Sequence, residues 1–332
     1  MNERLSPGKA PAKNPFYRQH LIRDAIGRAL YDGMTLDPSI YLFGEGAHMK
    51  VHYDHPDIER DFGDRVVTLP ISEDSNTNFA VGASLLGVKP VVDVITSDFL
   101  YRTFDSIANT AAKINFVAPD GEPPKTIVIR SEFLTGGPTT GQRPEALFTH
   151  IPGINVAIPS TPRDAYGLMR TALVTPGVTI CFEDRMILDS ETCTVELMST
   201  FQEERVPIPF AEVRLCTHPE APRLTVATYG LMRQVVEGLV WEQDLLEQVQ
   251  LLDLRTLYPI DWRTLFDSVQ RTGKLLIVEP DILYGGIGAE IAATAVDWGL
   301  SKIARLGAPR ETIPASREGQ ARMLPNREQI LE

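Results

Sequence analysis

The stretch TLPISEDSNTNFAVGASLLGVKPVVDVITSDFLYRTFDSIANTAAK (68–113) contains the alternation of patterns that decides the fold. Residues 80–87 are mostly small and predict a helix that packs closely on a sheet. The apolar run 90–95 predicts a strand, and residues 101–113 return to helical spacing. A strand between two helices in so short a stretch indicates a mostly parallel sheet with helices on both faces.

The same alternation extends to both sides of this stretch and is interrupted once. Further strands are expected at 40–43, 125–130, 155–160, 178–183, 224–230, 250–254 and 274–279, and further helices at 21–30, 162–174, 231–247 and 261–272. The alternation of strand and helix patterns stops over about 185–222, where Glu, Thr and Pro are frequent. The sequence therefore predicts an α/β protein with two domains, each a mostly parallel sheet flanked by helices. The expected order is a flexible tail (1–15), a first domain (16–190), a linker (191–222) and a second domain (223–332).

Composition narrows the class of protein. The 332 residues have a net charge of −12, which argues against nucleic acid or an anionic membrane as the main partner. No apolar run approaches the roughly 20 residues that span a bilayer. The polar, Pro-rich start is typical of a flexible tail rather than of a targeting segment. Three cysteines without a CxxC pattern indicate a reducing compartment, so we expect a cytoplasmic protein without structural zinc or a disulfide framework.

Two motifs resemble a dinucleotide-binding site and a metal site, but the residues around each motif favour another interpretation. GGIGAE (285–290) contains G-x-G before a helix but lacks the third glycine and the early position of a dinucleotide fingerprint, so we expect a tight strand-to-helix turn. His48, His52 and His55 are spaced as on one helical face, where they could share a metal ion. The glycines before them and the proline after them leave little room for a helix, so a solvent-facing or active-site loop is the favoured interpretation.

Many separate motifs resemble one family. The chain is similar to the beta subunit of the thiamine-diphosphate-dependent first component of 2-oxo acid dehydrogenase complexes. The matching motifs are GEG (44–46), PISE (70–73), GVKPVVD (87–93), DFLYRTFDSIANTAAK (98–113), EALFTHIPGINVAIPSTPRDAYGL (145–168), ATYGLM (227–232), DLRTLYPID (253–261) and EPDILYGGIGAEIAA (279–293). They occur in order over roughly 16–326. The resemblance implies a transketolase-like pyrimidine-binding domain followed by a transketolase C-terminal-like domain.

The resemblance also implies a cofactor site. Glu73 matches the acid whose buried carboxyl bonds the pyrimidine N1′ of thiamine diphosphate and favours the imino tautomer that activates the thiazolium. Phe99 matches the aromatic residue that packs on the pyrimidine, Ile95 and the backbone of Ile71 line the same pocket, and Glu45 supports the pyrimidine end. An alternative for Glu73 is an acid at a helix start, stabilised there by the helix dipole.

The family holds the diphosphate through Mg²⁺ bound by a GDG…N motif, which this sequence lacks. In the family that motif belongs to an alpha subunit. The resemblance therefore implies that this chain binds no metal itself, holds only the pyrimidine end, and works in an α2β2 heterotetramer. Thr175 and Gly177 replace acids where relatives often bind potassium, so that ion is not expected either.

Two departures concern the acyl acceptor and the substrate. The loop GGPTTGQRPEALF (136–148) has Thr140 where the family has a histidine that assists acyl transfer to a lipoyl group. A hydroxyl cannot shuttle a proton near pH 7, and losing such a base costs about 10²–10⁴-fold. Polar residues follow PISE, where relatives have small apolar ones. They form either a polar first helical turn or contacts to a hydroxylated substrate, and the candidate substrate contacts are Asn76, Asn78, His48 and Gln142.

Three functions remain open at this point. The first is a beta subunit that decarboxylates a 2-oxo acid and passes the acyl group to lipoyl. The second is a transketolase-like transfer of a two-carbon ketol or acyl unit to another acceptor, such as the phosphopantetheine thiol of a carrier protein. The third is a non-catalytic structural or regulatory subunit, against which the retained Glu73 and Phe99 argue.

Overall fold

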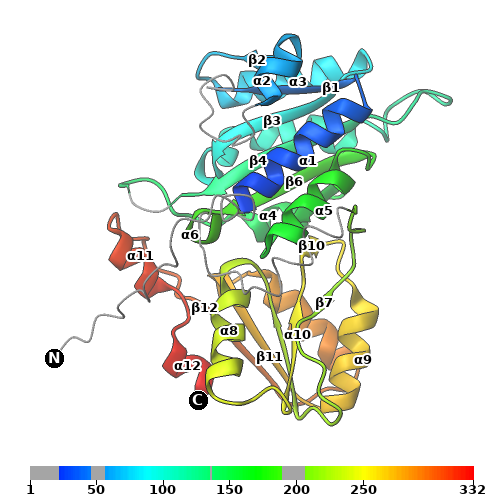
Figure 1. The fold of residues 1–332 in the computed structure, drawn as a ribbon. Coiled ribbons are helices and arrows are strands. Elements are labelled where there is room, and N and C mark those ends of the chain that lie inside the picture. The colour runs from blue at the N-terminus through cyan, green and yellow to red at the C-terminus, as the bar shows by residue number, and fades with distance from the viewer. Residues whose placement is uncertain (1–21, 46–56, 135–136, 189–205) are drawn as a thin grey trace.

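The computed structural model describes residues 22–45, 57–134, 137–188 and 206–332, which build two sheets (Figure 1). The strands of the first sheet are β1 (Ile40–Gly44), β2 (Val66–Thr68), β3 (Lys89–Thr96), β4 (Thr126–Phe133), β5 (Ile154–Ala157), β6 (Gly177–Asp184) and β10 (Thr256–Tyr258). Those of the second are β7 (Arg214–Leu215), β8 (Leu224–Thr228), β9 (Val249–Asp253), β11 (Leu275–Ile282) and β12 (Ile303–Ala308). The orders are β10-β5-β6-β4-β3-β1-β2 and β12-β11-β8-β9-β7. All pairs are parallel except β10–β5 and β7–β9, so the predicted fold class is confirmed.

Helices flank both sheets (Figure 1). Those before the second sheet are α1 (Ile22–Leu36), α2 (Asp57–Phe62), α3 (Glu73–Leu85), α4 (Glu145–Thr149), α5 (Pro162–Ala172) and α6 (Arg185–Leu188). Those of the second domain are α8 (Gly230–Glu242), α9 (Trp262–Thr272), α10 (Ile287–Asp297), α11 (Arg317–Met323) and α12 (Arg327–Leu331). The predicted helix at 101–113 is not a regular α-helix. It is mostly a succession of short turns, with a 3₁₀ segment at Ser97–Tyr101, a π segment at Ser106–Thr110 and a 3₁₀ segment at Ala111–Lys113.

Local capping explains where several helices begin and end. The Thr161 hydroxyl accepts a hydrogen bond from the Asp164 N–H before α5, and Pro162 occupies the first helical position. Asp261 caps α9 in the same way by accepting from the Thr264 N–H. That helix ends at Gly273, whose φ of 66° is the left-handed conformation that glycine adopts most readily. These boundaries follow from short sequence signals.

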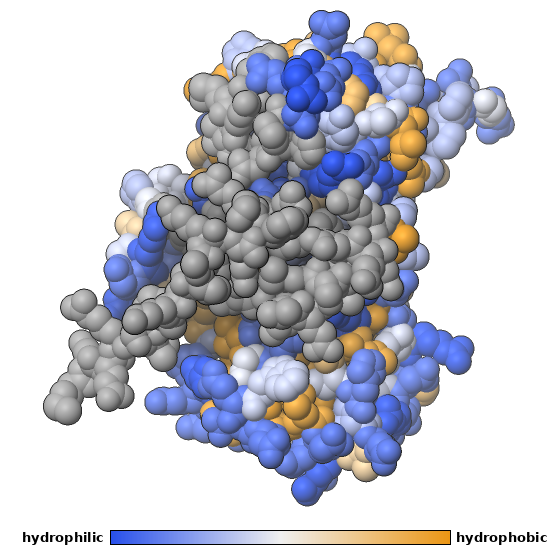
Figure 2. Space-filling model, viewed as in Figure 1, coloured by the Kyte–Doolittle hydropathy of each residue, from blue (hydrophilic) through white to orange (hydrophobic). Residues whose placement is uncertain are grey.

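The hydrophobic core consists of two clusters, and each continues through both domains. One lines α1 and α5 on the first sheet and α8 on the second, which lie on the same side in Figure 1. The other includes α3 and α4 of the first domain with α9 and α10 of the second. On the face shown in Figure 2 the described side chains at the margin are mostly hydrophilic, with scattered apolar groups. No helix among the described residues is long and apolar enough to cross a membrane.

The two domains share a strand. β10 comes from the second domain but pairs antiparallel with β5, placing Thr256 opposite Ala157 and Tyr258 opposite Val156. The part of the expected linker that the structure describes also packs on the domains. A Cβ at Gly167 of α5 would lie 2.4 Å from Ile208 Cγ1, and residues 214–215 form β7.

The GGIGAE stretch forms the expected tight turn. Gly286 precedes α10, and Gly285 has a φ of 79°. The Gly288 N–H donates to Glu279 Oε2 at 2.9 Å, and a Cβ at Gly286 or Gly288 would lie 2.6 Å from a Glu279 carboxylate oxygen. The start of α10 therefore binds a carboxylate of the protein itself.

Candidate active site

Three neighbouring parallel strands end at one edge of the first sheet. Gly44, the last residue of β1, lies beside Thr68 of β2 on one side and Asp93 of β3 on the other. A Cβ at Gly44 would lie 2.8 Å from the Asp93 Cβ, so glycine permits the close approach of β1 and β3. The segments that follow these strands contain Glu45, Glu73 and Phe99. The fold thus brings together three sequence-predicted site residues at the carboxyl edge of the strands, where α/β proteins bind ligands.

Glu45 connects the end of β1 to the turn before α3. Its Oε1 accepts hydrogen bonds from the Ser72 N–H at 2.7 Å and from Asn76 Nδ2 at 3.3 Å. Burial raises the pKa of Glu45, and the negative charges of Glu73 and Asp93 add to this, while the Ser72 N–H opposes it. Asn76 also donates to the Pro70 carbonyl at 3.0 Å. The Asn76 amide, a candidate substrate contact, therefore holds Glu45 and the PISE turn.

Glu73 is the first residue of α3 and is 8% exposed. Among the described residues the nearest partner of its carboxylate is Arg102, whose Nε lies 3.5 Å from Oε2 and whose side chain is 72% exposed. A buried carboxylate without a close donor has unused hydrogen-bonding capacity. Its position fits a ligand that presents an N–H, as the pyrimidine of thiamine diphosphate does.

The apolar residues assigned to the pocket differ in exposure. Phe99 follows β3, is half-buried and packs against the core cluster that includes α3. Ile95 is half-buried near the end of β3, whereas the Ile71 side chain is 85% exposed. Ile95 lies near the end of β3 and Phe99 in the turn that follows, and Arg102, directly after that turn, reaches Glu73. The exposed Ile71 side chain leaves its backbone as the part available to a cofactor.

Asp98, which the sequence reasoning did not single out, connects this edge to the loop with Thr140. Its carboxylate accepts from the Gly141 N–H at 3.1 Å, the Gln142 N–H at 3.0 Å and the Thr96 hydroxyl at 2.9 Å. The neighbouring Ser97 hydroxyl donates to the Gln142 carbonyl at 3.0 Å. We call residues 137–142 the acceptor loop. The acidic residue directly before Phe99, at a strand end, was the available signal.

The other candidate site residues differ in their exposure and in their hydrogen bonds. Thr140 is half-buried, and its carbonyl accepts from Gln320 Nε2 at 3.1 Å. The Gln142 side chain is exposed on the same loop. Asn78 donates within its own helix to Asp74, and at 2.7 Å to the Ser106 hydroxyl. His48, His52 and His55 lie outside the described residues. Nowhere in the described ranges do three His, Cys, Asp or Glu side chains gather as for a metal ion.

A buried ionic cluster lies directly behind the acceptor loop. Arg143 donates to Glu145 at 3.1 Å and to Asp184 at 2.9 Å, and its guanidinium lies 3.8 Å from the centroid of the Phe133 ring. Burial raises the pKa of Glu145, while Arg143 opposes the rise. Burial and Glu145 also raise the pKa of Asp281 well above its usual range. Because Asp281 belongs to β11, this cluster joins the second domain to the base of the loop.

Comparison with known proteins agrees with this arrangement. Residues 19–190 match the transketolase pyrimidine-binding domain and residues 216–330 match the transketolase C-terminal domain. A similar protein is the mitochondrial 2-oxoisovalerate dehydrogenase subunit beta of Chaetomium thermophilum, 33% identical over 92% of this chain, which spans 65% of that relative's length. The subunit beta of the acetoin:2,6-dichlorophenolindophenol oxidoreductase of Cupriavidus necator is 30% identical over 83% of each chain.

Two further matches bear on family and fold. The pyruvate dehydrogenase E1 component subunit beta of Rickettsia conorii is 27% identical over 83% of each chain. Among solved structures, an inactive beta4 tetramer of a split-gene transketolase matches with a TM-score of 0.74 over 91% of this chain and 92% of that one, at 18% identity. The latter shows the fold. The chain therefore belongs to the transketolase-like family that these two domains define and that includes the beta subunits of pyruvate and 2-oxoisovalerate dehydrogenases.

Proposed function

We propose that the chain is the beta-type subunit of a thiamine-diphosphate-dependent enzyme that cleaves a 2-oxo acid and passes the acyl unit to an acceptor. The observation that supports this most is Glu73. Its carboxylate is buried at the edge of the sheet, has no close donor among the described residues, and lies near the Glu45 carboxylate. When bound, thiamine diphosphate supplies a carbanion that attacks the carbonyl carbon of the donor substrate.

The residues of this chain then have separate tasks. Glu73 accepts the hydrogen bond of the pyrimidine N1′–H, and Phe99 packs on the pyrimidine ring. Glu45 fixes the PISE turn through Ser72 and Asn76, which orients the start of α3 and with it Glu73. A carboxylate fixed in a dry, preorganised site acts more strongly than one in water.

We further propose that an alpha-type subunit completes the site and holds the diphosphate with Mg²⁺, in an α2β2 assembly. Large apolar side chains are exposed in the PISE turn, on α3 and directly after it. Ile71 is 85% exposed, Phe79 52% and Leu86 88%. Exposed apolar groups clustered near a site are typical of a surface that another chain covers. The lipoyl- or phosphopantetheine-bearing acceptor protein belongs to the same proposal.

Thr140 favours a second candidate function. In the place of the family histidine it offers only a hydroxyl, which cannot accept and return a proton near neutral pH. This departure favours a transketolase-like transfer of a two-carbon unit from a ketose, to a carrier-protein thiol or another non-standard acceptor. The third possibility, a subunit without catalytic function, predicts no dependence of activity on Glu73.

The test is co-expression with the alpha-type partner and separate measurement of donor and acceptor steps. Donor cleavage is followed with a redox dye, using pyruvate, 2-oxoisovalerate, acetoin and a ketose phosphate. Transfer is followed with lipoyl domain and with carrier protein. Cleavage of a 2-oxo acid with lipoyl transfer supports the first function, ketose cleavage supports the second, and no cleavage of any donor contradicts both. A fluorescent fusion tests the expected cytoplasmic location, since some relatives are named as mitochondrial.

A further inference from the structure

The C-terminal segment of the chain reaches back to the acceptor loop. Gln320 of α11 donates through Nε2 to the Thr140 carbonyl at 3.1 Å, and its side chain is buried. The Gly137 N–H donates to the Ala315 carbonyl at 2.9 Å, immediately before α11. Ser316 caps this helix by accepting from the Gly319 N–H at 3.1 Å. Contacts from 180 residues away in sequence therefore fix the loop.

The loop is held by residues of both domains. Asp98 binds its Gly141 and Gln142 N–H groups from the first domain, while Gln320 binds the Thr140 carbonyl from the second. Gly141 has a φ of +104°, and a Cβ there would lie 2.6 Å from Gln320 Nε2. Glycine therefore allows the amide to approach the loop backbone. Because both domains bind the loop backbone, they set the positions from which the Thr140 and Gln142 side chains extend.

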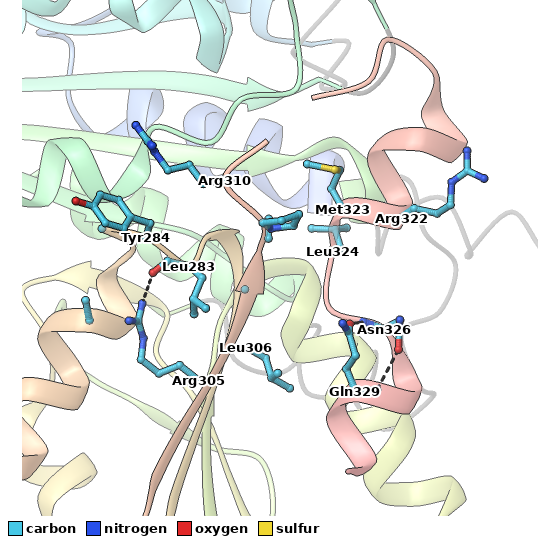
Figure 3. A pocket seen from close by; sticks show the side chains of 15 residues that line it. Leu283, Tyr284, Arg305, Leu306, Arg310, Arg322, Met323, Leu324, Asn326 and Gln329 are labelled. Carbon is cyan, nitrogen blue, oxygen red and sulfur yellow. Dashed lines mark hydrogen bonds between the residues drawn. The ribbon is translucent and has the colours of Figure 1, made fainter. Parts of the chain in front are cut away.

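Packing alone does not hold α11 against the loop. A cavity of about 50 Å³ lies between them, lined in part by Gly141, Ile313, Gln320 and Met323. α11 also borders a cavity of about 850 Å³, which shares Met323 and Leu324 with the smaller one (Figure 3). Because these two cavities adjoin α11, few apolar contacts can replace the Gln320 hydrogen bond if it is lost.

The larger cavity does not have the geometry of a ligand site of its own. Arg305 donates to Glu279 and to the Leu283 carbonyl, and the Arg310 guanidinium lies 5.3 Å from the Tyr284 ring centroid. In Figure 3 the side chains of Arg310 and Arg322 lie apart and diverge. The guanidiniums therefore do not converge on one anion.

We propose that Gln320 is a positioning residue for the acceptor step, and that the second domain thereby controls how the acyl acceptor meets the site. The inference rests on the proposed function, because it assigns the acceptor side to the loop with Thr140. Among the described residues, Gln320 bonds the Thr140 carbonyl of the loop, whereas Glu73 begins α3 and Phe99 follows β3. Its loss should slow transfer to the acceptor and leave donor cleavage unchanged.

The experiment compares Gln320→Met, Gln320→Ala and Gln320→Glu in the complex with the alpha-type partner. Met keeps the length of the side chain but cannot donate a hydrogen bond, and Glu keeps the shape but places an acceptor against the Thr140 carbonyl. We expect transfer to fall about 5- to 30-fold in all three, as for one lost hydrogen bond that leaves a carbonyl unsatisfied, with dye-linked donor cleavage within about 2-fold of wild type. Gln243→Ala, exposed at the end of α8, is the matched control.

A second readout does not need turnover. Hydrogen–deuterium exchange of the acceptor-loop amides should be about 10-fold faster in the Met and Ala variants than in the wild type, with strand β4 unchanged. Unaltered loop exchange, or donor cleavage and transfer falling together, would overturn the positioning role. A wild-type complex that cleaves no donor contradicts the proposed function instead, and the exchange measurement still decides whether Gln320 holds the loop.

Discussion

Replacing Glu73 with glutamine tests the centre of the proposed site. The change keeps the shape of the side chain and removes its charge. In the described part of the chain, the cation paired with this carboxylate is Arg102, at 3.5 Å and largely exposed, so the carboxylate gains little from that pairing. We therefore expect the free energy of unfolding to change by less than about 0.5 kcal/mol.

The effect on activity should be much larger. A hydrogen bond to a charged acceptor in a dry site contributes about 2–4 kcal/mol more than its neutral counterpart when the charge stabilises the reacting form. The rate of donor cleavage should therefore fall about 30- to 1000-fold. Loss of activity without loss of stability separates a cofactor contact from the alternative, in which Glu73 merely stabilises the start of α3 through the helix dipole.

The assay is dye-linked donor cleavage by the complex with the alpha-type partner, at saturating cofactor, beside thermal unfolding of the beta chain. Glu247→Gln, an exposed acid in the second domain, controls for the loss of one charge. Wild-type rates in the Glu73→Gln complex would refute the assignment. A drop in melting temperature that parallels the drop in rate would favour the helix-start interpretation.

Three other perturbations follow from the structure. Gly288→Ala would place a Cβ 2.6 Å from a Glu279 oxygen, so we expect a loss of about 1–3 kcal/mol in chemical denaturation, and an unchanged midpoint would contradict the geometry. Asp98→Asn turns an N–H donor toward the acceptor-loop amides, so hydrogen exchange of these amides should accelerate and acyl transfer should fall. Unaltered exchange would show that the carboxylate does not hold the loop. Burial and a neighbouring carboxylate raise the pKa of Asp253 to about 6, so the stability it contributes is complete below about pH 4 and is lost as the pH rises through about 6. The melting temperature of Asp253→Asn relative to wild type should rise over that window, and a constant difference would refute this.

Most of the fold could be predicted because most of its strands and helices show a regular spacing of apolar residues. The apolar runs that became β1, β3, β4 and β6 are long enough to stand out, and signals such as Thr161–Pro162 place helix starts. β2, β7 and β10 were missed because each has only two or three residues, too few for a pattern, and the six-residue β12 was missed as well. Pairing with distant strands, rather than local preference, makes them strands.

The site was predictable only in part. Glu45, Glu73 and Phe99 were found through motifs, and the structure brings them to one edge, although their roles stay predictions. Asn76 was expected as a substrate contact, whereas its amide is engaged with Glu45. Gln320 could not have been found, since no local pattern indicates a hydrogen bond between residues 180 positions apart.

Because β10 is shared between the domains, it affects the synthesis of the chain, its truncation and the exchange of its domains. While the chain is being synthesised, the first domain is complete in sequence before β10 exists, so the edge of β5 stays unpaired until residue 258 has left the ribosome. An open edge strand invites pairing with other chains. A fragment that stops before residue 256 should therefore aggregate, and an exchange of second domains between relatives must keep β10 matched to the recipient's β5.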